Sequence, residues 1–369
     1  MKAFHTAAVC AALMLGLSAC GPEYPVKKEM KSANKGNAEA QFNLGARYAK
    51  GDGVDKDFAE SFKWFTKAAG QGLTAAQNDL GECYYNGTGV SKDVAEAITW
   101  FRKAAEQEDA RAQCNLGACY ESVGNDIAEA IKWYTKAAGQ GYAEAQFNLG
   151  MCYLNGKGVD KDAAEAVKWF RKAAEQGLAV AQNNLGMCYH EGCGVGKDYA
   201  EAVKWVMKAA EQGEAGAQSN LGWHYENGEG VDKDTAEAIR WYMKAAGQGL
   251  VVAQNNLGEC YKNGVGVDKD AVEAVKWYTK AAEQGNAEAQ NSLGECYENG
   301  NGVGKDTVEA IKWYTKAAEQ GNAEAQDALE LNQREEAKER LAEDRRRHEA
   351  AMAEEKRRYE AEAAEARRQ

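Results

Sequence analysis

The sequence of 369 residues contains only two prolines and four histidines, and its one clearly apolar run lies within the first twenty residues. Scarce proline leaves helices uninterrupted, and 39 glycines supply breaks between them, which together are typical of many short helices. The histidines are scattered, without the spacing of a metal site or a catalytic triad. We therefore expect no metal, no cofactor and no catalytic residue.

A basic surface is also lacking. The formal net charge is -12, and the repeated part of the chain has no basic stripe interleaved with aromatic residues. A negative surface repels phosphate backbones, so nucleic acid is excluded as an expected partner.

The first twenty residues have the layout of an export signal, with Lys2 at the positive start and an apolar stretch over residues 7–16. This stretch is too short to span a bilayer. Residues 17–20 read Leu-Ser-Ala-Cys and resemble the lipobox of bacterial lipoproteins. The resemblance implies a signal peptide over 1–19, a lipid on Cys20 and, because Gly21 is not acidic, sorting to the outer membrane. The alternative is a plain secretory signal with a chance cysteine. Residues 20–35 would form a polar tether.

Eight tryptophans mark an internal repeat of 36 residues, with one interval of 33. They are Trp64, Trp100, Trp133, Trp169, Trp205, Trp241, Trp277 and Trp313. A Leu-Gly pair follows the same rhythm, from residues 44–45 to residues 293–294. A fixed period in this range indicates a helical solenoid, in which each unit buries its apolar face against its neighbours.

Each unit contains two predicted helices. In residues 143–177 the first helix carries Ala145, Leu149 and Cys152 on one face, and glycines end it. The second helix begins at Asp162, which forms a capping box with Glu165 that recurs in every unit. The glycine of each Leu-Gly pair lies inside the first helix at a cost of about 1 kcal/mol. We expect the second-helix tryptophan or a neighbouring backbone to approach it closely.

The unit AEAQFNLGMCYLNGKGVDKDAAEAVKWFRKAAEQG resembles the Sel-1-like repeat family, a relative of the tetratricopeptide repeats. The motifs A-x-x-x-L-G-x-x-Y, G-x-G-V-x-K-D and A-x-x-W-[FY]-x-K-A-A-x-Q-G recur through about residues 36–330. The resemblance implies an all-α, right-handed superhelical solenoid of about eight antiparallel helix pairs, with the first helices on a concave surface. It also implies an adaptor or scaffold that binds a protein or peptide partner.

Some cysteine-rich relatives have been linked to β-lactam binding or hydrolysis, which makes an envelope hydrolase the rival function. Ser32 and Lys35 match S-x-x-K, but the sequence has no S-D-N or K-T-G partner, so we predict that the protein is not an enzyme.

One first-helix position is repeatedly cysteine, at Cys83, Cys119, Cys152, Cys188, Cys260 and Cys296. Stacked helices lie roughly 8–10 Å apart, beyond disulfide reach. We expect buried core thiols, with a stray disulfide or a metal site as alternatives.

Asparagine recurs immediately before the Leu-Gly pair, and we call these six residues the amide ladder: Asn43, Asn115, Asn148, Asn184, Asn220 and Asn256. Asparagine is a mediocre helix former, so its recurrence needs a reason. Its amides would hold the backbone of an extended peptide, or would bond the backbone of a neighbouring repeat and serve the stack. Three residues further on, the residue type varies and includes Met151, Met187 and Trp223, which we expect to form an apolar part of a peptide-binding surface.

After residue 331 the glycines stop, and a dense mixture of Glu, Arg, Lys and Ala predicts a charged helical arm over 332–369. We expect it to be solvated, with contact to a partner or a membrane surface as the alternative. Residues 36–331 would then comprise eight repeats and a capping helix. The predicted location is the cell envelope, anchored by the lipid and facing the periplasm or the cell surface.

Overall fold

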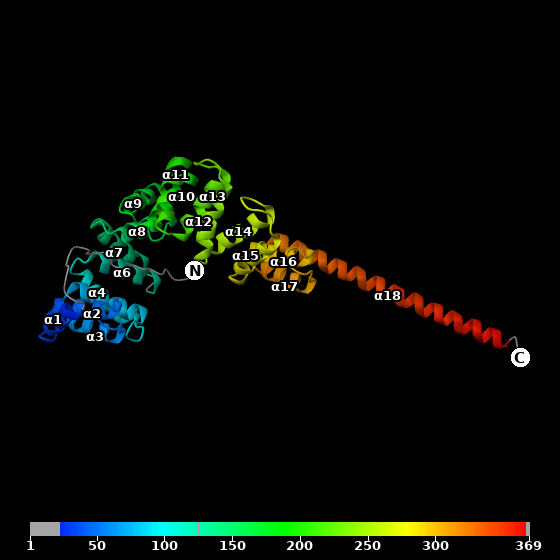
Figure 1. Cartoon of the computed structure of the whole chain (residues 1–369), viewed down its shortest axis with the longest axis horizontal. Helices are drawn as coiled ribbons and strands as arrows, with labels where there is room; N and C mark the ends of the chain where they lie inside the picture. Colours follow the sequence, from blue (N-terminus) through cyan, green and yellow to red (C-terminus); the bar gives the residue numbers. More distant parts are fainter. Residues whose placement is uncertain (1–22, 124–125, 367–369) are drawn as a thin grey trace. The chain divides into compact units, whose positions relative to one another are not determined.

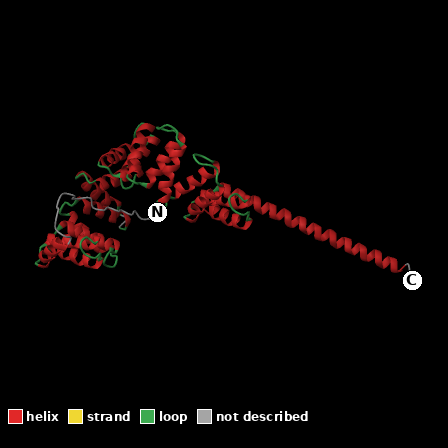
Figure 2. Ribbon diagram, viewed as in Figure 1, coloured by secondary structure: helices red, strands yellow, loops and turns green. Residues whose placement is uncertain are grey.

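The structure, a computed structural model, describes residues 23–123 and 126–366. Within these ranges the chain forms eighteen α-helices and no strand (Figure 2). The predicted all-α class and the predicted helix pairs are confirmed. No helix among the described residues is long and apolar enough to cross a membrane. The proposed lipidation site, Cys20, lies outside the described residues.

Each repeat contributes a first helix and a second helix. The first helices are α2 (Ala38–Lys50), α4 (Thr74–Asn86), α6 (Ala110–Ser122), α8 (Ala143–Asn155), α10 (Ala179–Glu191), α12 (Ala215–Asn227), α14 (Val251–Asn263) and α16 (Ala287–Asn299). The second helices are α3 (Phe58–Gly70), α5 (Val94–Ala105), α7 (Ile127–Gly139), α9 (Ala163–Glu175), α11 (Tyr199–Glu211), α13 (Thr235–Gly247), α15 (Ala271–Glu283) and α17 (Thr307–Glu319). Flanking them are α1 (Glu23–Asn34) and α18 (Ala323–Ala366) (Figure 1).

The helices belong to two compact units. The N-terminal unit ends at Asp162 and contains α1 to α8, and the C-terminal unit begins at Ala163 and contains α9 to α18. Within each unit, every helix packs against the helix before it and the helix after it. This sequential packing is the arrangement of a solenoid, because each repeat buries its apolar face only against its neighbours.

The core consists of small clusters between the second helix of one repeat and the first helix of the next. In one cluster Tyr242 of α13 packs with Leu257 and Cys260 of α14, and none of the three is more than 3% exposed. The leucine of every Leu-Gly pair is at most 1% exposed. Each leucine buried in this way contributes about 1.5–3 kcal/mol, so the repeated pairs supply much of the driving force for stacking.

Aspartate caps begin the second helices, as the repeat predicts. In α13 the side chain of Asp234 accepts a hydrogen bond of 2.9 Å from the backbone N–H of Glu237. The same role is filled by Asp57, Asp93, Asp126, Asp198, Asp270 and Asp306. The expected return contact of the glutamate is replaced by an ion pair one turn along the helix, such as Glu237 with Arg240 at 2.8 Å. The predicted cap is therefore confirmed. The glutamate, however, pairs with a basic side chain instead of returning a hydrogen bond to the cap.

The glycine of the Leu-Gly pair is approached by the residue that follows the tryptophan in seven of the eight repeats, those other than residues 143–178. A Cβ added at Gly258 would lie 2.4 Å from Cε1 of Tyr278, and one added at Gly45 would lie 2.7 Å from Cδ1 of Phe65. The expectation that tryptophan makes this approach is wrong, whereas the alternative of a neighbouring backbone is confirmed, because the carbonyl oxygen of Ser61 would lie 3.2 Å from the Cβ added at Gly45. The tryptophan instead packs against a core cluster, as Trp277 packs against the cluster that contains Tyr242, and a lysine three residues further covers its ring, as Lys280 covers Trp277 at 3.8 Å.

A buried glutamine in each first helix joins three consecutive helices, and sequence reasoning missed this feature. Gln218 of α12 is 5% exposed and donates through Nε2 to the carbonyl of Ala210 in α11, at 3.2 Å. Its Oε1 accepts a hydrogen bond of 2.8 Å from Gln248, which follows α13. The same acceptor role is filled by Gln41, Gln77, Gln113, Gln182, Gln254 and Gln290. Buried amides need such partners, so the repeat specifies both members of the pair.

The segment before the first repeat differs from the predicted tether. Residues 23–34 form α1, and Val26 and Ala33 are at most 5% exposed in a cluster with Leu44 and Trp64. The ion pair between Glu29 and Arg47, with atoms 2.5 Å apart, adds a contact to α2. A polar composition concealed an apolar face with helical spacing, and α1 covers the end of the stack.

The last helix combines the predicted capping helix and the predicted arm. Ala325 near the start of α18 is fully buried, and Asn332 donates to Glu298 at 3.1 Å. Beyond Asn332 the described side chains are exposed, and pairs such as Glu343 with Arg347 at 2.7 Å line the helix. Surface pairs of this kind contribute only about 0.3–0.5 kcal/mol each.

Candidate binding surface

Half of the amide ladder bonds to the preceding first helix. Nδ2 of Asn115 donates to Oδ1 of Asn78 at 3.0 Å, and Nδ2 of Asn220 donates to Oδ1 of Asn183 at 2.9 Å. Asn148 contacts the sulfur of Cys114 at 3.6 Å. These contacts join neighbouring first helices, and they run through side chains rather than through the backbone.

The other ladder residues have different surroundings. Asn184 bonds the carbonyl of Val180 in its own helix at 2.8 Å, and Asn256 hydrogen-bonds the hydroxyl of Tyr242. Asn43 is exposed on α2. The six asparagines therefore occupy equivalent helix positions with unequal freedom to meet a ligand, and their role in peptide binding stays a prediction.

The positions three residues after the ladder all reach the surface. They are Ala46, Glu82, Ala118, Met151, Met187, Trp223, Glu259 and Glu295, and all are half-buried except Trp223, which is 37% exposed. Met151 belongs to the N-terminal unit, while Met187 and Trp223 lie on the adjacent helices α10 and α12 of the C-terminal unit. The same face thus changes from apolar at α10 and α12 to acidic at α14 and α16.

Two histidines and a tryptophan meet beside this face. The ring of His190 lies 5.0 Å from that of Trp223 and 5.2 Å from that of His224, in edge-on arrangements. His224 is 1% exposed, and its Nδ1 lies 2.8 Å from the backbone carbonyl of Glu229. Burial lowers the pKa of His224 below its ordinary value. Sequence reasoning placed Trp223 in the predicted binding surface but took the histidines as scattered, and it did not bring His190 and His224 together.

An acidic hollow of about 520 Å³ lies on α14, α16 and the start of α18. Its lining includes Glu259, Glu288, Glu295 and Glu324, with Lys262 as its basic residue. Lys262 is paired with Glu295 at 3.0 Å, which leaves an excess of negative charge. We call this hollow the acidic groove. The repeat places Glu259 and Glu295 among the varied positions of the predicted binding surface, but it did not bring Glu288 and Glu324 to them.

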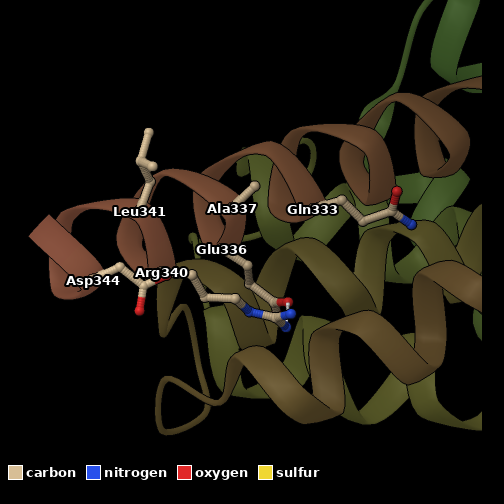
Figure 3. Close-up of a pocket in the computed structure, with 6 residues that line it drawn as sticks. All are labelled: Gln333, Glu336, Ala337, Arg340, Leu341 and Asp344. Atoms are coloured by element: carbon tan, nitrogen blue, oxygen red, sulfur yellow. Dashed lines mark hydrogen bonds and ion pairs between the residues drawn. The ribbon is translucent and has the colours of Figure 1, made fainter.

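A second hollow of about 470 Å³ runs along α18, and Figure 3 shows its six lining residues. All come from this single helix, between Gln333 and Asp344, and Arg340 pairs with Glu336 at 3.2 Å. One helix face cannot enclose a ligand, so this hollow reflects the pitch of the exposed arm.

The repeated cysteines lie in the core, and the residues of the S-x-x-K match lie around the end of α1. The six repeated cysteines are buried and unpaired, as expected, and burial raises the pKa of Cys188 to about 12. Ser32 and Lys35 lie at the end of α1, where the N–H of Lys35 donates to the carbonyl of Ser32 at 3.0 Å. Among the described residues, no His, Cys, Asp and Glu side chains gather in a group able to hold a metal ion.

Comparisons with known proteins agree with this geometry. A crystal structure of c5321, described as a protective antigen present in uropathogenic Escherichia coli strains displaying an SLR fold, is 40% identical, with a TM-score of 0.67. The match covers 82% of this chain and 66% of the other, so the chain spans just under two thirds of that protein. A Sel1 repeat protein from Oxalobacter formigenes is 32% identical over 88% of this chain and 97% of its own length, with a TM-score of 0.60.

The comparison with curated proteins found no match. The family model described as Sel1 repeat matches eight consecutive segments, 38–73, 74–109, 110–142, 143–178, 179–214, 215–250, 251–286 and 287–322. Sel1 repeats generally bind protein partners, and the proteins built from them are typically non-enzymatic scaffolds. With eight matched repeats, this chain belongs to the Sel1 repeat family.

Proposed function

We propose that this protein is a lipid-anchored scaffold of the cell envelope, which binds a segment of a partner protein along its first helices. The observation that carries the binding role is the contrast between neighbouring positions of the first helix. The leucines and glutamines of the repeat are buried and constant, whereas the residues three positions after the amide ladder are accessible and vary from Ala to Trp. A constant scaffold with a varied surface suits recognition of a specific partner.

The anchor rests on sequence. The tetrapeptide Leu-Ser-Ala-Cys ending at Cys20 supports lipidation, and several acyl chains would hold the protein on a membrane, because each buried methylene contributes about 0.8 kcal/mol. The similar Escherichia coli protein is described as a protective antigen, which supports an exported location. The outer membrane, facing the periplasm or the cell surface, is the proposed site.

A matched pair of variants tests the binding face. Trp223 on the first helix α12 and Met243 on the second helix α13 are 37% and 42% exposed, so replacing either with serine removes a similar accessible apolar side chain. In pull-downs from envelope extracts, Trp223→Ser should lose the partner and Met243→Ser should retain it. Equal retention by both variants, with folding verified by circular dichroism, would contradict the proposal.

Two further experiments test the remaining parts of the proposal. If the amide ladder holds a peptide, simultaneous substitution of Asn148, Asn184, Asn220 and Asn256 by alanine should also release the partner while helicity is retained.

For the anchor, a clickable palmitate analogue should label the wild-type protein, and Cys20→Ser should abolish the label and release the protein from membranes. Labelling that persists in Cys20→Ser would contradict lipidation at this residue.

A further inference from the structure

The acidic groove contains a buried acceptor without a donor. Asn255 of α14 is 7% exposed and lines the groove, and its Nδ2 donates to Glu288 at 3.4 Å. Its Oδ1 is buried and has no hydrogen-bond partner. A buried amide oxygen without a donor costs about 1–3 kcal/mol, which binding of an N–H donor would recover. Because Glu288 lies beside it, the missing donor is best supplied by a cation.

The N-terminal unit shows what such a donor looks like. There Arg111 of α6 extends to α4, where its guanidinium contacts Asp79 and lies 3.9 Å from Glu82. Asn78 and Asn115 both donate to Glu82, at 2.8 and 3.2 Å. Two carboxylates, one of them held by two amides, therefore contact a guanidinium that the chain itself provides.

The repeat pattern places the acidic groove at the equivalent position. Five repeats later along the sequence, Asn78 and Glu82 correspond to Asn255 and Glu259. The position of Arg111, however, is occupied by Glu288, so the internal cation is replaced by another carboxylate. The equivalent of Asn115 is Ser292, which donates to Glu259 at 3.3 Å, whereas Asn115 donates to Oδ1 of Asn78. The serine at position 292 leaves Oδ1 of Asn255 without a donor, and the glutamate at position 288 removes the internal cation. Asp79 corresponds to Asn256, so the carboxylates of the acidic groove are Glu259 and Glu288.

The next repeat extends the same negative surface. Asn291 of α16 donates to Glu295 at 3.2 Å and to Glu324 of α18 at 3.3 Å, and Glu324 again stands where the N-terminal unit has Arg111. Glu288 and Glu324 are both exposed. Two adjacent repeats thus offer carboxylates to a ligand that reaches across the first helices.

We propose that the acidic groove on α14, α16 and the start of α18 binds an arginine-bearing, basic segment of the partner protein, whose guanidinium takes the place that Arg111 fills in the N-terminal unit. This inference rests on the proposed function and names the chemistry of the partner. A guanidinium fits because it donates several N–H groups from one plane to carboxylate and amide oxygens together.

A peptide titration tests the inference with the full-length protein in detergent. The probe is a short fluorescein-labelled peptide that alternates arginine with glycine, and its control carries citrulline, a neutral isostere, in place of arginine. Fluorescence anisotropy should show binding of the arginine peptide and none of the citrulline peptide. Affinity should fall as salt rises from about 0.1 to about 1 M, because ions screen the exposed carboxylates.

Two substitutions at one position distinguish this groove from a generally acidic surface. Glu288→Gln should weaken the arginine peptide at least about tenfold, since it removes a charged hydrogen-bond acceptor. Glu288→Arg should abolish binding while the fold is retained, because it supplies an internal guanidinium opposite Glu259. The matched control is Glu283→Gln, which removes the same charge from the exposed end of α15 and should leave affinity unchanged.

The outcomes separate this inference from the broader proposal. Absence of peptide binding, equal binding of the citrulline peptide, or equal affinity in Glu288→Gln and Glu283→Gln would overturn it. Calcium chloride is the second probe, and calcium binding that depends on Glu288 without arginine-peptide binding would also overturn it, by making the groove a metal site. A partner captured through Trp223, with no affinity for the arginine peptide, would refute this inference and leave the proposed scaffold function standing.

Discussion

Substitution of the glycine inside a first helix tests how the repeats pack. In Gly258→Ala the new Cβ would lie 2.4 Å from Cε1 and 2.5 Å from Cδ1 of Tyr278. Carbon atoms ordinarily approach to about 3.5–4.0 Å, so the ring must move by about 1 Å. Tyr278 is fully buried, and its hydroxyl donates to Glu259 at 2.6 Å, so the movement disturbs both the core and the acidic groove.

Two opposing effects set the size of the change. Alanine is favoured over glycine in a helix by about 1 kcal/mol, while overpacking a core costs about 1–3 kcal/mol. We expect the clash to win and the free energy of unfolding to fall by about 1–2 kcal/mol. The control is Gly247→Ala at the end of α13, where an added Cβ meets no atom within 4 Å and where alanine should stabilise.

Urea denaturation followed by far-UV circular dichroism measures both variants. The expected result is a lower midpoint for Gly258→Ala and an unchanged or higher midpoint for Gly247→Ala. A Gly258→Ala protein at least as stable as the wild type would refute the argument that close ring packing requires glycine here.

Three further predictions follow from burial and backbone geometry. A thiol reagent at pH 8 should react rapidly with half-exposed Cys193 and slowly with buried cysteines such as Cys188, whose pKa is about 12; fast labelling of several thiols would contradict this. Glu108 has a positive φ of 66° where other repeats have glycine, so Glu108→Gly should raise the urea midpoint by relieving about 1 kcal/mol of strain. Burial lowers the pKa of His224 below the ordinary histidine value of 6.5. The neutral imidazole therefore contributes to the stability of the fold above pH 6.5, and this contribution is lost as the pH falls. His224→Cys should therefore flatten the loss of stability below pH 6.5, and an equally steep loss would refute this assignment.

Sequence reasoning succeeded where a residue's role follows from its period. Leu257 and Asp270 recur at fixed positions, so the buried face and the start of the second helix could be predicted, and both are confirmed. It failed where neighbours on a helix compete for one contact. Trp277 and Tyr278 are adjacent aromatics, and only the packed structure shows that Tyr278 lies on Gly258 while Trp277 lies beneath Lys280.

Polar residues concealed other features. Gln218 and Gln248 recur in the sequence like the tryptophans, but their mutual hydrogen bond joins α12 to the residue that follows α13, and helical periodicity does not predict such a pair. In α1, Val26, Met30 and Ala33 have the i, i+4, i+7 spacing of a buried face, and all three pack in one cluster. The prolines and lysines around them favoured a tether instead.

The binding surface was only partly predictable, because the contacts of its residues depend on the neighbouring helices. The ladder positions could be found from the repeat, but Asn115 and Asn220 bond to a neighbouring helix whereas Asn43 is exposed. The free oxygen of Asn255 depends on what stands at position 292, which becomes evident only when adjacent first helices are seen packed together.

The most direct test of the account is photo-crosslinking in cells, with a photoreactive amino acid placed at Trp223 or at Met243. These positions are similarly exposed, on a first helix and on a second helix of the same unit. If the first helices hold a partner, position 223 should yield a discrete adduct with one protein and position 243 should yield none. Adducts from neither position, or the same adduct from both, would contradict the claim that the first-helix surface is where the partner binds.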